Sequence, residues 1–371
     1  MDRSEKKIHT GRITIHQKDK NQKSMSTVIQ SQFYKFHDTV KLETIDNQQV
    51  IEKREMLIDE IKAFFKKKAE DEGKPLITFS IFNQGSYAMG TGIKPMNDKD
   101  DYDIDVALIF NINKDNYTPI EVKKWVHDAL DAKQFRKVEW KKPCIRVQYT
   151  EDGFPKFHID FAIYSAPESN TDNKTYLAIG KPTLSKDQNF WEVSEPKKLK
   201  DLINGKFTDS LEKSQFIRTI RFYKRWKDNK FDTVYGKPTG IALTALAYNG
   251  FTPHTKEYFN GQENINDHKA LIEFTKYIIN QFSGWSGRIE VKLPVPPYND
   301  LCEKMTDDQC KTFKERLQKL KQVLEDAYEE TDPHEACKML KKEFGDDFPI
   351  PPKEDTGQGR KKAVVGTNES A

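Results

Sequence analysis

One stretch of the chain, residues 84–110, constrains the fold more than any other. It reads QGSYAMGTGIKPMNDKDDYDIDVALIF: a turn of small residues, a loop, and two aspartates that run into an apolar strand. Side chains along a strand alternate between its faces, so Asp103 and Asp105 point the same way, roughly 6 to 7 Å apart. Two carboxylates on one face repel each other unless a cation lies between them, and hard oxygen ligands suit Mg²⁺. The spacing therefore predicts a metal site at this strand.

A glycine-serine turn lies upstream of the two aspartates. Gly85 and Ser86 follow another apolar segment, residues 77–82, which predicts a strand. A glycine allows the backbone to approach a ligand closely, so the local amides and the Ser86 hydroxyl can hold phosphate oxygens. A phosphate-binding turn beside two metal-binding carboxylates predicts nucleotidyl transfer.

A third aspartate lies on a predicted hairpin. Residues 144–150 and 156–164 both alternate apolar and polar side chains, and Glu151-Asp152-Gly153 between them is a turn signal. Asp160 falls in mid-strand, where aspartate is depleted. A buried, hydrogen-bonded acid is one interpretation. Placed beside Asp103 and Asp105, however, Asp160 would complete a carboxylate triad and serve as the general base for an attacking hydroxyl.

The second half of the chain is predicted to be mainly helical. Helical spacing covers residues 211–230, 238–248 and 334–344, and Thr306 to Gln309 has the capping-box pattern that opens a helix. The first of these helices is rich in lysine and arginine. Lys224 lies at the edge of its apolar side and is expected to face a phosphate, whereas Arg218 is expected on the more exposed face.

Composition narrows the class of protein. The chain has 371 residues, a net charge of +3, and four scattered cysteines without a CxxC pair, which argues against a structural zinc site. The small net charge favours a protein that binds small anionic ligands over one that coats nucleic acid, and a nucleic-acid activator is not indicated. No signal peptide and no run of 18 apolar residues is present, so we expect a soluble cytoplasmic protein that makes no membrane contact.

Several further motifs carry a family resemblance. GSYAMGT, YDIDVALIF and HIDFAIY are followed in order by WEVSEPKKL, RTIRFYKRWK, KPTGIALTAL, LPVPPYNDL and EFGDDFP. This ordered set resembles the bacterial cGAS/DncV-like nucleotidyltransferases (CD-NTases), over residues 30–352. The glycine-serine and DxD elements alone occur throughout the wider polymerase-β superfamily.

The resemblance implies an α+β, polymerase-β-like nucleotidyltransferase core plus a C-terminal helical domain, the bilobal architecture of cGAS and oligoadenylate synthetase. It implies four regions: a disordered extension (1–28), the core (29–200), the helical domain (201–352) and a flexible tail (353–371). It also implies a site in which two Mg²⁺ ions, replaceable by Mn²⁺, bind Asp103, Asp105 and Asp160. Substrate contacts would come from Gln84, Gly85, Ser86, Lys224 and Thr239.

The activity implied is template-independent synthesis of a cyclic di- or trinucleotide from ATP and possibly GTP, in anti-phage (CBASS) signalling. The alternatives are a nucleotidyltransferase that modifies a macromolecule such as tRNA or protein, and an inactive module that senses nucleotides or RNA. In part of the family a ubiquitin-transfer-like partner joins the synthase's C-terminal carboxylate to another molecule. By this resemblance Ala371 would be the corresponding conjugation point; the alternative is a disordered tail without a task. Either Met1 or Met25 can be the start.

Overall fold

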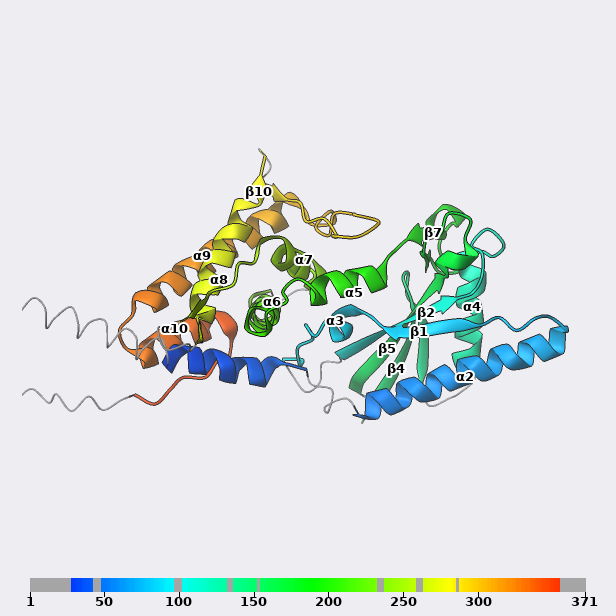
Figure 1. Ribbon diagram of the computed structural model, residues 1–371, viewed down its shortest axis with the longest axis horizontal. Coiled ribbons are helices and arrows are strands. Elements are labelled where there is room, and N and C mark those ends of the chain that lie inside the picture. Colours follow the sequence, from blue (N-terminus) through cyan, green and yellow to red (C-terminus); the bar gives the residue numbers. More distant parts are fainter. Residues whose placement is uncertain are drawn as a thin grey trace, which may run out of the picture.

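The computed structural model describes residues 28–42, 48–96, 102–131, 136–151, 154–231, 237–257, 263–284 and 287–353. The molecule is elongated, with a sheet at one end and a group of helices at the other (Figure 1). We call residues 48–193 the sheet part, and residues 28–40 together with 196–353 the helical part. Among the described residues, no helix is both long and apolar enough to cross a membrane.

The sheet part is built on a mixed sheet of seven described strands. Strand β2 runs parallel to β5, and the other paired strands of the sheet are antiparallel, in the order β1-β2-β5-β4-β3 with β6 beside β5 and β7 beside β6. The strands are β1 (Phe79–Asn83), β2 (Tyr102–Phe110), β3 (Lys137–Trp140), β4 (Ile145–Glu151), β5 (Phe154–Ser165), β6 (Tyr176–Ile179) and β7 (Phe190–Val193). The expected α+β class is confirmed. The predicted turn residues 152–153 lie outside the described residues.

The two faces of this sheet differ. Because side chains alternate along each strand, Phe157, Ile159, Phe161 and Ile163 of β5 all enter one core. Helices α2 (Gln48–Glu72) and α4 (Pro119–Leu130) cover that face with apolar side chains, and α2 lies along the sheet in Figure 1. The opposite face carries the aspartates and only a small apolar cluster that includes Ala162 and Tyr164. One face is thus left for a site.

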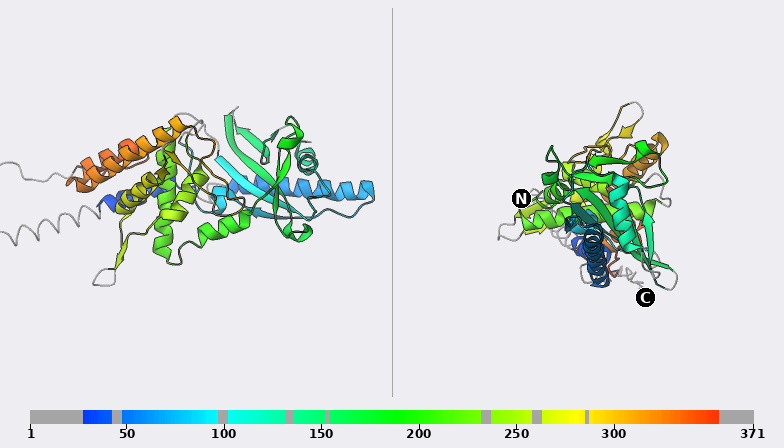
Figure 2. Two further views of the ribbon diagram at one scale, coloured as in Figure 1. Left: turned by 90° about the horizontal axis from the view of Figure 1, so that it is seen from above. Right: turned by 90° about the vertical axis from the view of Figure 1, so that its right-hand side faces the viewer.

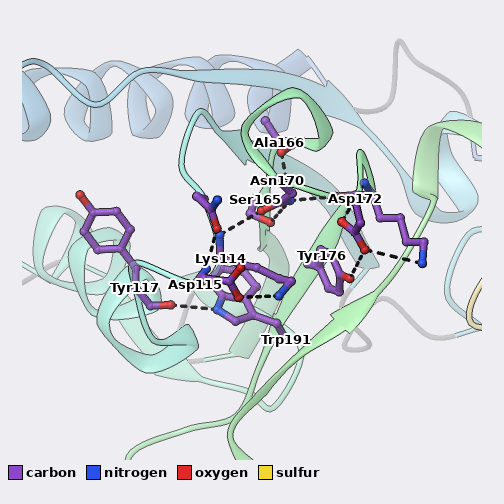
Figure 3. Close-up of polar contacts among 11 residues, drawn as sticks. Lys114, Asp115, Tyr117, Ser165, Ala166, Asn170, Asp172, Tyr176 and Trp191 are labelled. Carbon is purple, nitrogen blue, oxygen red and sulfur yellow. Dashed lines mark hydrogen bonds and ion pairs between the residues drawn. The ribbon is translucent and has the colours of Figure 1, made fainter.

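A polar network fixes the far end of this sheet (Figure 3). The buried Asn170 carboxamide donates to the Ser165 hydroxyl (2.8 Å) and accepts from the Lys114 amide (2.9 Å). Nearby, the Trp191 indole on β7 donates to the Tyr117 carbonyl at 2.9 Å. These bonds connect the loop after β2 to the segment after β5 and to β7.

The helical part contains the helices predicted from the sequence, with bounds shifted by a few residues. Thr306 forms both bonds of the capping box, and Gly345 ends the last helix with φ +87°. The helices are α5 (Pro196–Asn204), α6 (Ser210–Lys230), α7 (Gly240–Gly250), α8 (Asp267–Asn280), α9 (Asp307–Glu329) and α10 (Pro333–Phe344). Two hairpins complete it: β8 (Thr255–Glu257) with β9 (Glu263–Ile265), and β10 (Phe282–Ser283) with β11 (Arg288–Ile289).

The helix over residues 28–40 belongs to the core of the helical part. Ile29, Phe33, Phe36 and Val40 are at most 3% exposed and lie in the same apolar cluster as α6, α7, α8, α9 and α10. In Figure 1 this helix lies beside α10, at the end of the molecule away from the sheet. Residues 29–40 were expected in the nucleotidyltransferase core, but they pack in the helical part instead. An amphipathic pattern shows that a helix is buried, but it does not show which core buries it.

Candidate active site

Strand β2 and its neighbours bring four charged side chains onto one face of the sheet. Asp105 lies directly opposite Asp160 of β5, and Asp160 lies opposite Arg146 of β4. Residues opposite each other in adjacent strands share a face, and Asp103 shares it because it is two residues from Asp105. The sequence analysis expected all three aspartates to come together, and the structure places them on adjacent strands.

The glycine-serine turn packs directly on this face. Gly85 begins the short helix α3 (Gly85–Ala88) with φ +66°, and the Gln84 amide donates to the Asp105 carbonyl at 2.9 Å. A Cβ atom on Gly85 would lie 1.9 Å from Oδ2 of Asp105. Only glycine therefore fits between this turn and the aspartate. The Gln84 carboxamide accepts from the Tyr164 hydroxyl at 2.9 Å, which fixes the start of the turn.

A cleft of about 710 Å³ lies between the sheet part and the helical part. The turn and strand β2 contribute Gln84, Gly85, Ser86, Asp103 and Asp105 to its wall. The helical part contributes Lys224 of α6, residues of α7, and part of the loop that joins β11 to α9. Most of the predicted site residues therefore line a single cleft, of a size that ordinarily holds a small ligand.

The electrostatics of the cleft fit a cation. Burial, and next the nearby carboxylates of Asp103 and Asp160, raise the pKa of Asp105 to about 7. Negative charge at this point is thus destabilised in the protein alone, and a divalent cation would relieve it. Asp103 is exposed to the cleft, so its carboxylate is accessible to such an ion. The donor set of Asp103 and Asp105, with oxygen ligands only, suits Mg²⁺ or Mn²⁺.

Asp160 is engaged by a partner that the sequence analysis missed. Arg146 donates from Nε and Nη2 to the two carboxylate oxygens of Asp160, each at 2.8 Å, and Asp160 is 7% exposed. Among the described residues, no three His, Cys, Asp or Glu side chains are arranged as they stand to hold a metal. Asp160 would therefore have to share its oxygens with Arg146 to act in a triad. The alternation of the predicted hairpin was the available signal, since it puts Arg146 and Asp160 on the same face.

Lys224 lies where the cleft meets α6. It is 7% exposed, and its Nζ donates to the carbonyl (2.9 Å) and hydroxyl (3.1 Å) of Thr91, just after the glycine-serine turn. Burial, and next the charge of Lys227, lower the pKa of Lys224 to about 7. The lysine thus links the helical part to the segment that carries the turn, a contact that the sequence analysis did not foresee.

Two other predicted residues have different positions. Thr239 is exposed and is the N-cap of α7, where its hydroxyl accepts from the Ala242 amide at 3.2 Å. Its neighbour Gly240 lines the cleft. Ala371, the suggested conjugation point, lies outside the described residues, as do Met1 and Met25.

Arg218 was predicted to lie on the more exposed face of its helix, and this prediction was wrong. The side chain is 6% exposed and donates to both oxygens of Asp267, at 2.8 and 2.9 Å. Asp267 is fully buried and also accepts from the Gln30 carboxamide at 2.8 Å. The basic helix α6 is therefore buried on more than its apolar side, because an acid 49 residues away neutralises the arginine.

A mixed sheet with a glycine-serine turn, two aspartates on the adjacent strand and a helical second part defines a nucleotidyltransferase fold. Residues 79–164 match the family described as "Cyclic GMP-AMP synthase DncV-like, nucleotidyltransferase domain". A cyclic GMP-AMP synthase of Escherichia albertii is 27% identical over 182 residues, which span 47% of this chain and 38% of that relative. The match thus covers well under half of the relative's length.

The solved structures agree on the fold. Vibrio cholerae DncV, a cyclic AMP-GMP synthase, has a TM-score of 0.65 at 17% identity, and the match covers 84% of this chain and 93% of that one. The same protein with a linear intermediate has a TM-score of 0.65 at 16% identity, covering 85% and 97%. The chain thus shares the fold of Vibrio cholerae DncV, and its residues 79–164 match the DncV-like nucleotidyltransferase domain.

Proposed function

We propose that this protein is a template-independent nucleotidyltransferase that uses ATP, and possibly GTP, to make a cyclic di- or trinucleotide. The observation that carries the proposal is one cleft that contains the glycine-serine turn, Asp103, Asp105 and Lys224. The related Vibrio cholerae enzyme has been solved with GTP and with a linear intermediate, which supports nucleotide substrates.

Each residue has a proposed task in the transfer. Gly85 and Ser86 bind the triphosphate, and Lys224 supplies positive charge beside it. Asp103 and Asp105 would hold one or two Mg²⁺ or Mn²⁺ ions, which when bound stabilise charge on the attacking and leaving oxygens. Asp160 accepts the proton of the attacking hydroxyl, with Arg146 fixing the direction of its carboxylate.

The biological setting follows from the family and is part of the same proposal. We infer a cytoplasmic enzyme of anti-phage (CBASS) signalling whose product activates an effector. An activating partner that resembles ubiquitin-transfer proteins would join Ala371 to another molecule. Removing the last few residues should then leave synthesis by the purified protein unchanged and abolish the higher-mass conjugate in cells that carry the complete operon.

The direct test of the activity is the double substitution Asp103→Ala/Asp105→Ala. We expect no detectable cyclic product and no pyrophosphate release from the four NTPs with Mg²⁺, while the melting temperature is unchanged or higher because mutually repelling carboxylates are removed. The matched control is Asp115→Ala/Asp128→Ala, which removes two exposed carboxylates of the sheet part. Product formation is followed by mass spectrometry. Equal product yields from the wild type and the double variant would refute the mechanism, and label found on a macromolecule would favour the modifying enzyme.

A further inference from the structure

The cleft has walls of two kinds. Its charged end contains Asp103, Asp105 and Lys224, whereas four apolar side chains of the loop between β11 and α9 form another part of its wall. Those side chains belong to Leu293, Val295, Pro297 and Leu301. A nucleotide has the same division, with a charged triphosphate at one end and a flat, largely apolar base at the other. The loop wall is therefore one apolar part of the cleft that suits a base.

Hydrogen bonds hold the two ends of this loop together. One oxygen of Asp300, Oδ1, accepts from the amides of both Val291 and Cys302, each at 2.9 Å. The Leu301 amide donates to the Val291 carbonyl at 2.8 Å, and Val291 and Cys302 are at most 2% exposed. The loop extends from the helices toward the sheet part (Figure 1). Asp300 thus fixes both ends of a segment whose alternate residues, from Leu293 to Leu301, line the cleft.

Asn299 is the polar side chain that this loop presents to the cleft. Its backbone carbonyl accepts from the Leu293 amide at 3.0 Å, which fixes its position. Its carboxamide makes no hydrogen bond to any residue that the structure describes. Three other polar side chains of the cleft have partners: Gln84 bonds Tyr164, Lys224 bonds Thr91, and Thr244 bonds the Gly240 carbonyl, whereas the Asn299 side chain is exposed. Asn299 is thus available to bind a ligand.

At the N7 edge of a purine, the chemistry of a carboxamide favours adenine over guanine. It offers a donor and an acceptor side by side, which match N7 and the N6 amino group of adenine. Guanine presents two acceptors, N7 and O6, at the same edge, so the carboxamide oxygen would face an acceptor. We propose that Asn299 is a specificity-determining residue that binds the base of an adenine nucleotide, and that Asp300 is the positioning residue that holds it there. This assignment rests on the proposed function.

The test measures binding, so that it does not depend on turnover. Non-hydrolysable ATP and GTP analogues are titrated calorimetrically into the full-length protein with Ca²⁺. The wild type should prefer the ATP analogue. Asn299→Asp removes the donor to N7 and adds a negative charge that repels both triphosphates, so it should weaken ATP-analogue binding roughly tenfold more than GTP-analogue binding. Lys292→Ala, an exposed residue of the same loop, is the control and should change neither affinity.

The role of Asp300 is tested by rescue. Asp300→Ala removes the acceptor of both amides and should reduce the preference for the ATP analogue, whereas Asp300→Asn keeps Oδ1 as an acceptor and should preserve it. A variant that is only less stable would lose affinity for both analogues equally. Equal effects of Asn299→Asp on the two analogues, or a wild type without preference, would overturn this assignment and leave nucleotide transfer standing. If neither analogue binds, the proposed function falls together with the assignment.

Discussion

At the scale of single residues, the contact between Gly85 and Asp105 leaves no room for a side chain on the glycine. The turn lies very close to strand β2. A methyl group on the Cα of Gly85 would therefore displace the Asp105 carboxylate. The φ of +66° adds a second reason for glycine. The glycine-serine turn and strand β2 are therefore fixed relative to each other because Gly85 has no side chain.

We expect Gly85→Ala to lower synthesis by about 100-fold or more, because displacement of a catalytic group by about 1 Å is enough for such a loss. Gly90→Ala is a matched control: Gly90 also has a positive φ (+64°), but a Cβ there would have no neighbour within 4 Å. That control should lose about 1 kcal/mol of stability and keep most of its activity. Steady-state rates and thermal melts separate the two outcomes; similar activity losses would show that backbone strain alone matters.

The pair of Arg218 and Asp267 gives a second prediction at this scale. Arg218→Ala leaves a fully buried carboxylate without its cation, so the free energy of unfolding should fall by about 3 to 5 kcal/mol. Lys213→Ala, at an exposed position of the same helix, should change it by less than about 0.5 kcal/mol. Urea denaturation measures both. A small loss in Arg218→Ala would mean that water reaches Asp267 in the native protein.

At the scale of elements, side chains of α6 bind the segment that follows the glycine-serine turn. Besides the Lys224 bonds to Thr91, Arg225 donates to the Lys94 carbonyl at 2.7 Å. The Lys94 amide in turn donates to the Val40 carbonyl at 2.8 Å, and Met89 is buried in the core of the helical part. The turn thus lies on the sheet part, while its continuation is anchored in the helical part.

We therefore expect Lys224→Met to raise the apparent KM for NTP roughly tenfold or more, through loss of charge and through release of Thr91. The residue keeps its volume, so packing against Gly240 is retained. Lys213→Met on the same helix serves as the comparison. The measurement is the dependence of the initial rate on NTP concentration, and equal KM values for the two variants would contradict the link.

The elements differ in how far the sequence could predict them. Residues 211–230 and 334–344 were predicted almost to their ends, because long apolar periodicity and capping residues are local signals. Strands β3, β6 and β7 were not predicted; each has four residues and exists only because a partner strand is present. Among site residues, Asp103 and Asp105 followed from their spacing. Arg146 and the burial of Arg218 did not, since each depends on a carboxylate distant in sequence.

At the scale of the whole molecule, the helical part is assembled from two separate pieces of the chain. Helix 28–40 contributes Phe33 and Phe36, whose ring centroids lie 5.2 Å from that of Phe348 and 5.3 Å from that of Phe344. The sheet part lies between these pieces in sequence and beside them in space (Figure 2). Residues 196–353 alone therefore lack part of their own core.

Two truncations test this arrangement. A chain that begins at residue 28 should keep the melting temperature of the full protein, since the described contacts are retained. A chain that begins at residue 43 loses four buried apolar residues, Ile29, Phe33, Phe36 and Val40, and should not fold stably. Each large apolar side chain removed from a core costs about 2 to 5 kcal/mol, so the sum exceeds the stability of a typical domain. Cooperative melting of the shorter chain would show that the helix is dispensable.

The pairing of helix 28–40 with α10 also has a consequence for the order of events during translation. The ribosome makes this helix near the start, but Phe344 and Phe348 are added more than 300 residues later. At a synthesis rate of about 5 to 20 residues per second, the apolar side of the helix has no packing partner in α10 for roughly 15 to 60 s. The sheet part can form within that interval, whereas the core of the helical part closes only when synthesis is nearly complete. The cleft, which needs both parts, is consequently the last feature of the enzyme to exist.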